Sequence, residues 1–348
     1  MPKKKVSKQI VLPPLIIKNT FPMGPQLPEK IRWSVSKAKV FKKCKRKFFW
    51  KYIMHLQSRA KAAPLLFGSY FHEGLAEWYR TKRSSMKKIA ARYAITAGEE
   101  IRAASEYYDQ FEYDKLMTLI DTFEGMLIGY GEVYRHERKI WIIDREGIEA
   151  EKTIDMGEFD FIFKTDLITK KMVKNRERHH LVEHKTAAQI PDSYIDVLPL
   201  DTQVRGYIFG ANHPKGLNKT VSEVIYDVVK KCKLRRKSNE PLDVFSQRIA
   251  DDYMNRPDFY FFREKLKFNK SDIAAFELEL RQVHTEYQWL IDTLKDPLDP
   301  RYWAPSDFIC NEFFKKCPYS TLCLQGLDRG TACMYEQFIK EEKSAEED

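Results

Sequence analysis

The hydrophobic pattern changes its period along the chain, and this change limits the fold more than any other feature of the sequence. Up to about residue 140, apolar residues recur at the spacing of buried helix faces, as in Phe71, Leu75 and Tyr79. From Trp141 they come in short alternating runs, which predict strands. The predicted strands are residues 149–153, 160–169, 180–184 and 222–230. Helices are predicted over 84–140, 201–211 and 243–296, the last with a break near Pro257. This mixture predicts an α/β fold.

The charge balance indicates a nucleic acid as the partner. The 348 residues include 60 Lys and Arg against 50 Asp and Glu, a net charge of +10, and the 43% hydrophobic content is sufficient for a core. Basic residues are dense in 37–51 and 230–237, where they can neutralise phosphates. The aromatic residues of the first stretch can stack on bases or belong to the core. No apolar run is long enough to cross a membrane, so no membrane partner is expected.

Two carboxylates and a lysine occupy positions that a sheet would bring together. Glu183 and Lys185 are two apart on a predicted strand and so point to the same face, and Asp166 lies on the preceding predicted strand. Oxygen ligands of this kind are those that Mg²⁺ and Mn²⁺ prefer. A divalent ion beside an ammonium group is suited to phosphodiester hydrolysis. Because charges also alternate along many half-exposed strands, these three residues alone leave a purely structural role open.

The order of several motifs resembles the RecB-like branch of the PD-(D/E)xK nuclease superfamily. The resemblance covers residues 33 to 326 and rests on Ser34-x-Ser36-Lys37, Phe41-x-x-Cys44-x-x-Lys47-Phe48, Phe67-Gly68-x-x-x-His72, Asp166, Glu183-x-Lys185-Thr186 and Gln203-x-x-x-Tyr207. It implies a restriction-endonuclease-like fold with a mixed central sheet flanked by helices, a helical insertion and a C-terminal iron–sulfur cap. Ser36 is also expected to be the N-cap of the first helix.

The resemblance assigns roles to these residues. It implies that His72, Asp166 and Glu183 hold Mg²⁺ or Mn²⁺, with the carbonyl of His184 as a further ligand. Lys185 would orient the attacking water, and Gln203 and Tyr207 would hold the nucleic-acid backbone. From the residues alone, His72 can equally be a packed histidine and Tyr207 a core residue. Glu149 and Glu151 can support the metal or lie on a solvated strand face.

One position departs from the family pattern. The family usually has glycine three residues before its catalytic aspartate, whereas this chain has Phe163. Gly157 and Asp160 satisfy the glycine spacing, but they leave a long stretch before Glu183. We therefore expect Asp166 to be the catalytic aspartate because Leu167 continues the strand, and we keep Asp160 as the alternative.

Four cysteines resemble the iron–sulfur ligands of AddB-type nucleases and of the CRISPR-associated adaptation nucleases. One of them precedes the carboxylates and three follow, namely Cys44, Cys310, Cys317 and Cys323. The resemblance implies a structural [4Fe-4S] cluster. Four thiolates can instead bind Zn²⁺ or be buried thiols, and Cys333 can replace one ligand. Cys232 is expected to be a free thiol, and six cysteines in a chain of this length indicate a reducing, cytoplasmic setting.

The patterns and the resemblance together divide the chain into five regions. Residues 1–30 form a basic, proline-rich arm, and 31–140 form a helical region with the first cysteine and the metal-ligand histidine. A nuclease core over 141–235 and a second helical region over 236–300 follow. Residues 301–348 form the iron–sulfur cap and an acidic tail.

The function implied is a Mg²⁺- or Mn²⁺-dependent deoxyribonuclease, and an exonuclease that acts on DNA ends is expected. Single-stranded DNA or DNA ends would be the substrate, in DNA repair or recombination. No ATP-binding motif is present in the sequence, so a helicase or recombination protein is a candidate partner. Two alternatives stay open. One is a catalytically inactive, nuclease-like DNA-binding or scaffold subunit, which Phe163 favours, and the other is a zinc-stapled nucleic-acid-binding module.

Overall fold

The computed structural model describes residues 27–81, 85–137, 141–173, 176–312, 315–327, 331 and 334–337. The chain divides into two compact units. One unit contains Lys30–Ala38 and Ala60–Glu286, and the other contains Lys39–Arg59 and Tyr287–Asp348 together with the N-terminal residues. None of the described helices is both long enough and apolar enough to span a membrane.

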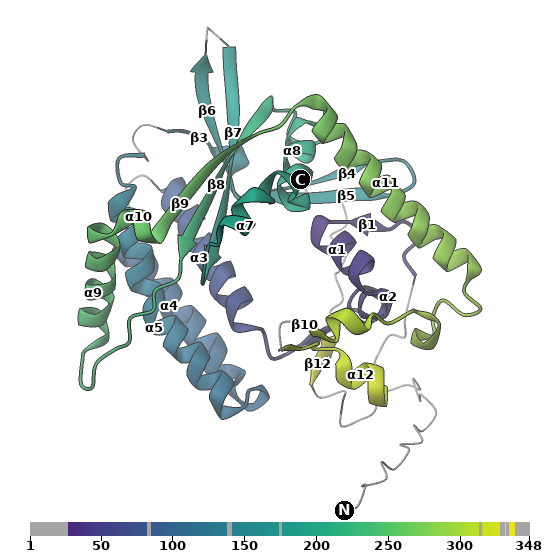
Figure 1. Cartoon of the computed structure of the whole chain (residues 1–348), viewed down its shortest axis with the longest axis horizontal. Helices are drawn as coiled ribbons and strands as arrows, with labels where there is room; N and C mark the ends of the chain where they lie inside the picture. The colour runs from purple at the N-terminus through teal and green to yellow at the C-terminus, as the bar shows by residue number, and fades with distance from the viewer. Residues whose placement is uncertain are drawn as a thin grey trace, which may run out of the picture. The chain divides into compact units, whose positions relative to one another are not determined.

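The larger unit is built on a five-stranded mixed sheet in the order β3-β6-β7-β8-β9 (Figure 1). Its strands are β3 (Ile142–Asp144), β6 (Leu167–Val173), β7 (Arg176–Ala187), β8 (Val221–Lys230) and β9 (Phe261–Lys267). β7 and β8 are parallel, and the other neighbours are antiparallel. The predicted strand over 222–230 is confirmed as β8. The helical region predicted over 243–296, with a break near Pro257, is α9 (Leu242–Asn255), α10 (Pro257–Tyr260) and α11 (Lys270–Thr293), and the prediction misses only the strand β9 after the break.

A second, three-stranded sheet in the order β1-β5-β4 explains an error in the predicted strands. It consists of β1 (Arg32–Trp33), β4 (Ala150–Asp155) and β5 (Asp160–Thr165). The single strand predicted over 160–169 is two strands in different sheets, because the chain leaves β5 and enters β6 at Asp166. This aspartate therefore lies at the junction of the two sheets rather than within a strand.

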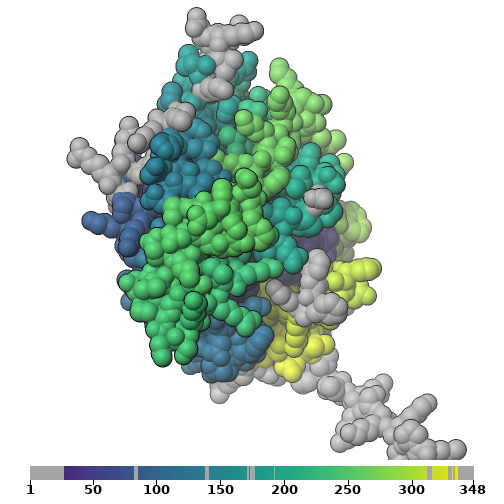
Figure 2. Space-filling view, turned by 60° about the vertical axis from the view of Figure 1, so that its left-hand side comes forward, coloured from purple at the N-terminus to yellow at the C-terminus, as the bar shows by residue number. Residues whose placement is uncertain are grey.

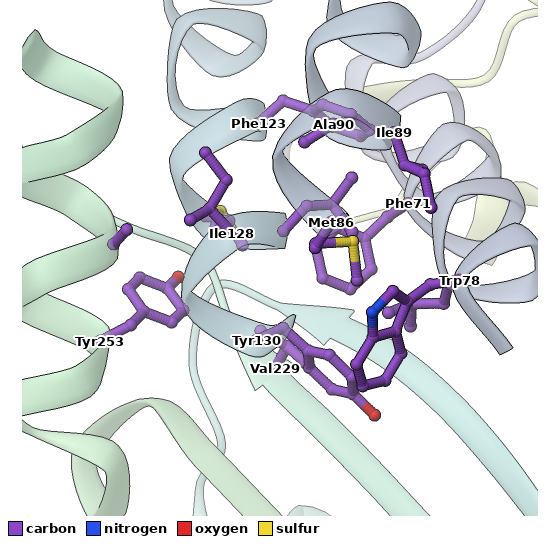
Figure 3. Packing of buried hydrophobic residues seen from close by; sticks show 14 of the residues in the cluster. Phe71, Trp78, Met86, Ile89, Ala90, Phe123, Ile128, Tyr130, Val229 and Tyr253 are labelled. Carbon is purple, nitrogen blue, oxygen red and sulfur yellow. The ribbon is translucent and has the colours of Figure 1, made fainter. Parts of the chain in front are cut away.

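Four helices cover one face of the large sheet. They are α3 (Ala63–Arg80), α4 (Met86–Ala103), α5 (Gln110–Val133) and α9 (Leu242–Asn255). Their apolar side chains share one cluster with strand residues such as Val182 and Val229, and Figure 3 shows Phe71, Met86 and Tyr130 within it. α9 lies beside α5 (Figure 2). A Cβ at Gly129 would lie 2.6 Å from Tyr253 Cβ, so glycine permits this close packing.

α8 (Thr202–Asn212) covers the opposite face of the sheet, and it confirms the helix predicted over 201–211. Val204 and Ile208 of α8 pack against Leu181, Val224 and other strand residues in a separate apolar cluster. The large sheet is therefore buried on both faces. Its strand β8 consequently reads as a mainly apolar run, in which Asp227 is conspicuous.

Phe163 has a structural partner that accounts for its departure from the family pattern. Its side chain is 2% exposed on β5 and lies parallel to Phe161 at a centroid distance of 6.1 Å. A Cβ at Gly210 of α8 would lie 2.4 Å from the Phe163 ring. The phenylalanine therefore occupies space that a glycine on the facing helix leaves open.

The smaller unit is held together by an aromatic core. Its elements include α2 (Lys45–Phe48), η1 (Phe49–Ile53), β2 (Leu56–Ser58), β10 (Asn311–Glu312), β11 (Lys315–Lys316), α12 (Ser320–Gln325) and β12 (Tyr335–Gln337). β2 pairs with β12, and β10 pairs with β11. Phe41 and Phe48 are fully buried, 5.1 Å apart between centroids, and Trp303 stacks on Phe48. Of the two interpretations of these aromatic residues, the structure supports burial in the core.

Helix α1 (Val35–Lys43) begins earlier than predicted. Ser34 Oγ, rather than Ser36, accepts a hydrogen bond from the backbone N–H of Lys37 at 3.2 Å. The prediction of Ser36 as the N-cap is wrong, because Val35 and Ser36 already lie in the helix. The remaining elements are α7 (Asp192–Asp196), α10 (Pro257–Tyr260), α11 (Lys270–Thr293) and short 3-10 turns at 105–107, 145–147, 198–200, 300–302 and 307–309.

We predict that Gly210→Ala destabilises the protein by about 1–3 kcal/mol, because the added methyl group overlaps the Phe163 ring. Gly68→Ala in α3 is the matched control, since no atom lies within 4 Å of its added Cβ, and it should be neutral or slightly stabilising. Urea unfolding measures both. Equal stability of the two variants would show that Phe163 does not require the glycine.

Candidate metal centre

Asp166 lies where β7 extends beyond the end of its pairing with β6. β6 begins at Leu167, which pairs with Val182, so the next residues of β7 have no partner on that edge. The backbone N–H of His184 instead donates to Asp166 Oδ2 at 2.9 Å. N–H and C=O of one strand residue point to the same neighbour. The carbonyl of His184 therefore faces the edge where Asp166 lies, as a metal ligand would require.

Helix α3 and the loop before β4 add two further ligand groups. His72 Nδ1 of α3 lies 3.3 Å from Asp166 Oδ2. Ligand atoms of His72, Glu149 and Asp166 lie within 4.8 Å of one another. Glu149 has a φ of 50°, which non-glycine residues rarely adopt, and its N–H donates to the carbonyl of Asp166 at 3.0 Å. Its carboxylate also pairs with Lys164 Nζ at 2.6 Å.

Glu183 and Lys185 point to the α8 face of the sheet and pair with each other. Glu183 is fully buried, and its Oε2 has no hydrogen-bond partner among the described residues. Burial and the charge of Asp166 raise the pKa of Glu183. Burial alone would lower the pKa of Lys185, but the charges of Glu183 and Asp166 outweigh burial and raise it. The lysine is therefore a firmly protonated cation beside a carboxylate that resists ionisation.

The electrostatics of Asp166 are the reverse of those of Glu183. Burial would raise the pKa of Asp166, but the interaction with His72 and the charge of Lys185 lower it strongly. One carboxylate of the pair is thus stabilised as an anion, while its neighbour is not. Such opposed shifts between adjacent buried groups are characteristic of sites prepared for a ligand or a reaction.

Helix α8 supplies the third side of the site. Asp201 caps the helix, accepting from the N–H of Gln203 at 2.6 Å. Gln203 Oε1 accepts from Lys185 Nζ at 3.1 Å, and Gln203 Nε2 donates to the hydroxyl of Tyr207 at 2.8 Å. Gln203 thus orients the lysine and the tyrosine at once, a connection that sequence spacing does not reveal.

The residues present fit a hard divalent cation. The unpartnered oxygen of Glu183, the two other carboxylates and the imidazole of His72 are the oxygen and nitrogen ligands that Mg²⁺ and Mn²⁺ accept. The fallback residue Asp160 lies elsewhere, in ion pairs with Lys30 at 2.8 Å and Arg32 at 3.8 Å. Among the candidate residues, the structure therefore groups His72, Glu149, Asp166, Glu183, His184, Lys185, Gln203 and Tyr207 around one location. Glu151 is exposed on β4.

The candidate cysteines all belong to the smaller unit. Cys44 is buried and caps α2 by accepting the N–H of Lys47 at 3.3 Å. The N–H of Cys317 donates to the carbonyl of Cys310 at 2.9 Å. Burial raises the pKa of Cys317, with further contributions from Cys44 and Cys310, and burial raises the pKa of Cys323 to about 11. None of these four thiols forms a disulfide. Cys333 lies outside the described residues.

We predict that Glu183→Gln changes how the metal-free protein responds to pH. The folded-state pKa of Glu183 is raised, so the folded protein keeps a proton that the unfolded chain releases. Wild-type stability therefore falls relative to the variant as pH rises above the ordinary glutamate pKa, about 4.3. The relative loss should reach about 1 kcal/mol or more between pH 5 and pH 8.

Urea unfolding in chelator at several pH values tests this, with Glu151→Gln as a control that removes an exposed carboxylate. Added Mg²⁺ or Mn²⁺ should then stabilise wild type more than Glu183→Gln. Parallel pH profiles for all three proteins would contradict the buried-carboxylate interpretation.

Comparison with known proteins agrees with this geometry. A search of curated proteins finds no match to the sequence. A family model described as the PD-(D/E)XK nuclease superfamily matches residues 32–324, which include every residue of the candidate metal centre. With that match over most of its length, the chain belongs to the PD-(D/E)XK nuclease superfamily.

Proposed function

We propose that the protein is a Mg²⁺- or Mn²⁺-dependent deoxyribonuclease of the RecB-like branch, with exonuclease activity at DNA ends. The observation that carries the proposal is the contact chain around Glu183, whose unpartnered oxygen lies beside the Lys185–Gln203 pair. Asp166 lies at the unpaired edge of β7, and His72 of α3 reaches it with Nδ1 3.3 Å from Asp166 Oδ2. The alternative of an inactive scaffold would need no buried lysine oriented by an amide.

Each residue then has a defined task. His72, Asp166 and Glu183 hold the cation, with the His184 carbonyl as a further ligand. When bound, the cation polarises the scissile phosphate and lowers the pKa of a coordinated water. Lys185, kept protonated by its carboxylate neighbours, orients the water and stabilises charge on the phosphate. Gln203 fixes the ammonium of Lys185, and Tyr207 presents a hydroxyl to the nucleic-acid backbone.

An exposed basic loop supports DNA as the substrate. β8 ends at Lys230, and the loop that follows carries Lys233, Arg235, Arg236 and Lys237 with exposed side chains. Because β7 and β8 are parallel and Ala187 pairs with Lys230, this loop lies at the sheet end toward which β7 runs after Lys185. Backbone phosphates near the metal centre would meet these cations, giving affinity that falls steeply with salt.

We predict that Lys185→Ala abolishes DNA cleavage, reducing it by about 10²-fold or more, because the water and the developing phosphate charge lose their cation. Lys265→Ala is the matched control, since it removes an exposed lysine from β9 of the same sheet. The assay uses end-labelled linear DNA, single- and double-stranded, with Mg²⁺ or Mn²⁺.

Circular DNA of the same sequence separates the two modes of cleavage. An exonuclease degrades the linear substrates and leaves the circles intact, whereas an endonuclease cuts both. Absence of metal-dependent cleavage of any substrate by wild type would favour the inactive DNA-binding scaffold. Equal activity of wild type and Lys185→Ala would contradict the assigned role of the lysine.

We further propose that Cys44, Cys310, Cys317 and Cys323 hold a structural [4Fe-4S] cluster. Supporting this are the location of all four in the smaller unit and the electrostatic interaction of Cys317 with both Cys44 and Cys310. Metal binding would offset the cost of deprotonating Cys317 and Cys323, whose pKa values burial raises, because iron–sulfur clusters bind the deprotonated sulfur. The cluster would join the turn between α1 and α2, where Cys44 lies, to the C-terminal segment.

We predict that protein purified without oxygen is brown and absorbs at about 400 nm. The Cys317→Ser variant should lose both the colour and the iron. Cys232→Ser is the control, because Cys232 is a buried thiol in the larger unit and should leave iron content unchanged. Elemental analysis distinguishes the alternatives. Zinc without iron in the purified protein would show that the cysteines bind Zn²⁺ rather than a cluster. Absence of both metals would show that they are free thiols.

A further inference from the structure

Three charged or polar residues form a row across the face of the large sheet that lies opposite Glu183 and Lys185. His184 of β7, Asp227 of β8 and Arg263 of β9 are register partners on adjacent strands. His184 Nδ1 lies 3.0 Å from Asp227 Oδ2. Arg263 binds the same carboxylate in a two-pronged contact, with Nε 2.9 Å from Oδ1 and a terminal nitrogen 3.0 Å from Oδ2.

Two helices close over this row with tyrosines. The hydroxyl of Tyr130 in α5 donates to Asp227 Oδ2 at 2.7 Å, and the hydroxyls of Tyr130 and Tyr79 lie 3.1 Å apart. The Tyr79 ring, from α3, lies nearly parallel to the imidazole of His184 at a centroid distance of 5.9 Å. Figure 3 shows Tyr130 within the apolar packing that surrounds it. The imidazole of His184 is therefore held by Asp227 on the neighbouring strand and by the ring of Tyr79 from α3.

Burying these charged groups in the core is energetically unfavourable. Asp227 is fully buried, and although burial alone would raise the pKa of its carboxyl, Arg263 and His184 lower it, so the residue is an anion. Replacing buried ion pairs by apolar residues of similar volume is often neutral or stabilising. The charged row instead fixes the position of His184. The contacts on Asp227 form only when β7, β8, β9 and α5 are correctly placed relative to one another.

The residue held in this way is the one that links the two sides of the metal centre. His184 lies between Glu183 and Lys185, its N–H fixes Asp166 Oδ2, and its carbonyl faces the same edge of β7. A shift of residue 184 would change the separation of Asp166 from Glu183. It would also turn the carbonyl away from the cation.

We infer that Asp227, supported by Arg263 and Tyr130, is a positioning residue that sets the divalent-metal affinity of the site through His184. The inference rests on the proposed metal-dependent nuclease function and assigns to Asp227 no contact with metal or substrate. Groups one contact removed from metal ligands commonly change metal affinity by about 10–100-fold when they are replaced.

The experiment measures Mn²⁺ binding to the full chain by calorimetry, alongside the Mn²⁺ dependence of DNA cleavage. Asp227→Asn should raise the Mn²⁺ dissociation constant by about tenfold or more. The Mn²⁺ concentration needed for half-maximal cleavage should rise in parallel, with a smaller change in the rate at saturating metal. Tyr130→Phe, which keeps the ring and removes one donor to Asp227, should weaken binding in the same direction.

The matched control is Glu240→Gln, since Glu240 forms a similar two-pronged pair with Arg248 at 2.8 and 2.7 Å in the same unit. This variant should lose stability without losing Mn²⁺ affinity. If folded Asp227→Asn binds Mn²⁺ as wild type does, or Glu240→Gln weakens binding equally, the inference is overturned. Should Asp227→Asn not fold, unchanged affinity of Tyr130→Phe overturns it.

Wild-type binding separates this inference from the proposed function. If wild type and Glu183→Gln bind Mn²⁺ alike, the metal centre itself is wrong, whatever Asp227 does. If only Glu183→Gln loses binding while both Asp227→Asn and Tyr130→Phe retain it, the metal centre stands and the positioning role alone fails.

Discussion

The site depends on the early end of one strand pairing. Because β6 begins at Leu167, β7 continues past it with an unpaired edge, and that edge receives the carboxylate of Asp166 from the junction of two sheets. If β6 began two residues earlier, it would form hydrogen bonds with the backbone N–H and C=O of His184, and these groups would not be available to Asp166 or to a metal. The buried Glu183–Lys185 pair then projects from the same stretch of β7 into a region that α8 closes with Gln203.

This arrangement places groups with opposite electrostatic preferences close together at the expense of stability. Asp166 is held as an anion, whereas Glu183 resists ionisation in the metal-free protein. A divalent cation would remove the repulsion between them and satisfy the oxygen of Glu183 that lacks a partner. In the positioning role that we infer for it, the neighbouring row of Asp227 and Arg263 would keep these strands in register against that repulsion.

The sequence is informative where chemistry and local periodicity coincide. The resemblance to the nuclease family predicts the residues that converge on Asp166, and the helix carrying Gln203 and Tyr207 is evident from its own pattern. The break between β5 and β6 is not evident, because the alternation of residues 160–169 continues through it. β9 is hidden for another reason: it is an edge strand rich in charge, and its sequence Phe-Phe-Arg-Glu-Lys-Leu-Lys lacks the apolar run of a central strand. The contacts of Asp227 with Arg263 and Tyr130 join three separated segments, and no local pattern encodes them.

Phe163 is bulky where the family pattern leads one to expect glycine, and Gly210 on the facing helix leaves the space that its ring occupies. The bulky ring on the strand lies against bare backbone on the facing helix, where an added Cβ would come within 2.4 Å of it. Loss of the family glycine therefore does not by itself indicate a degenerate enzyme.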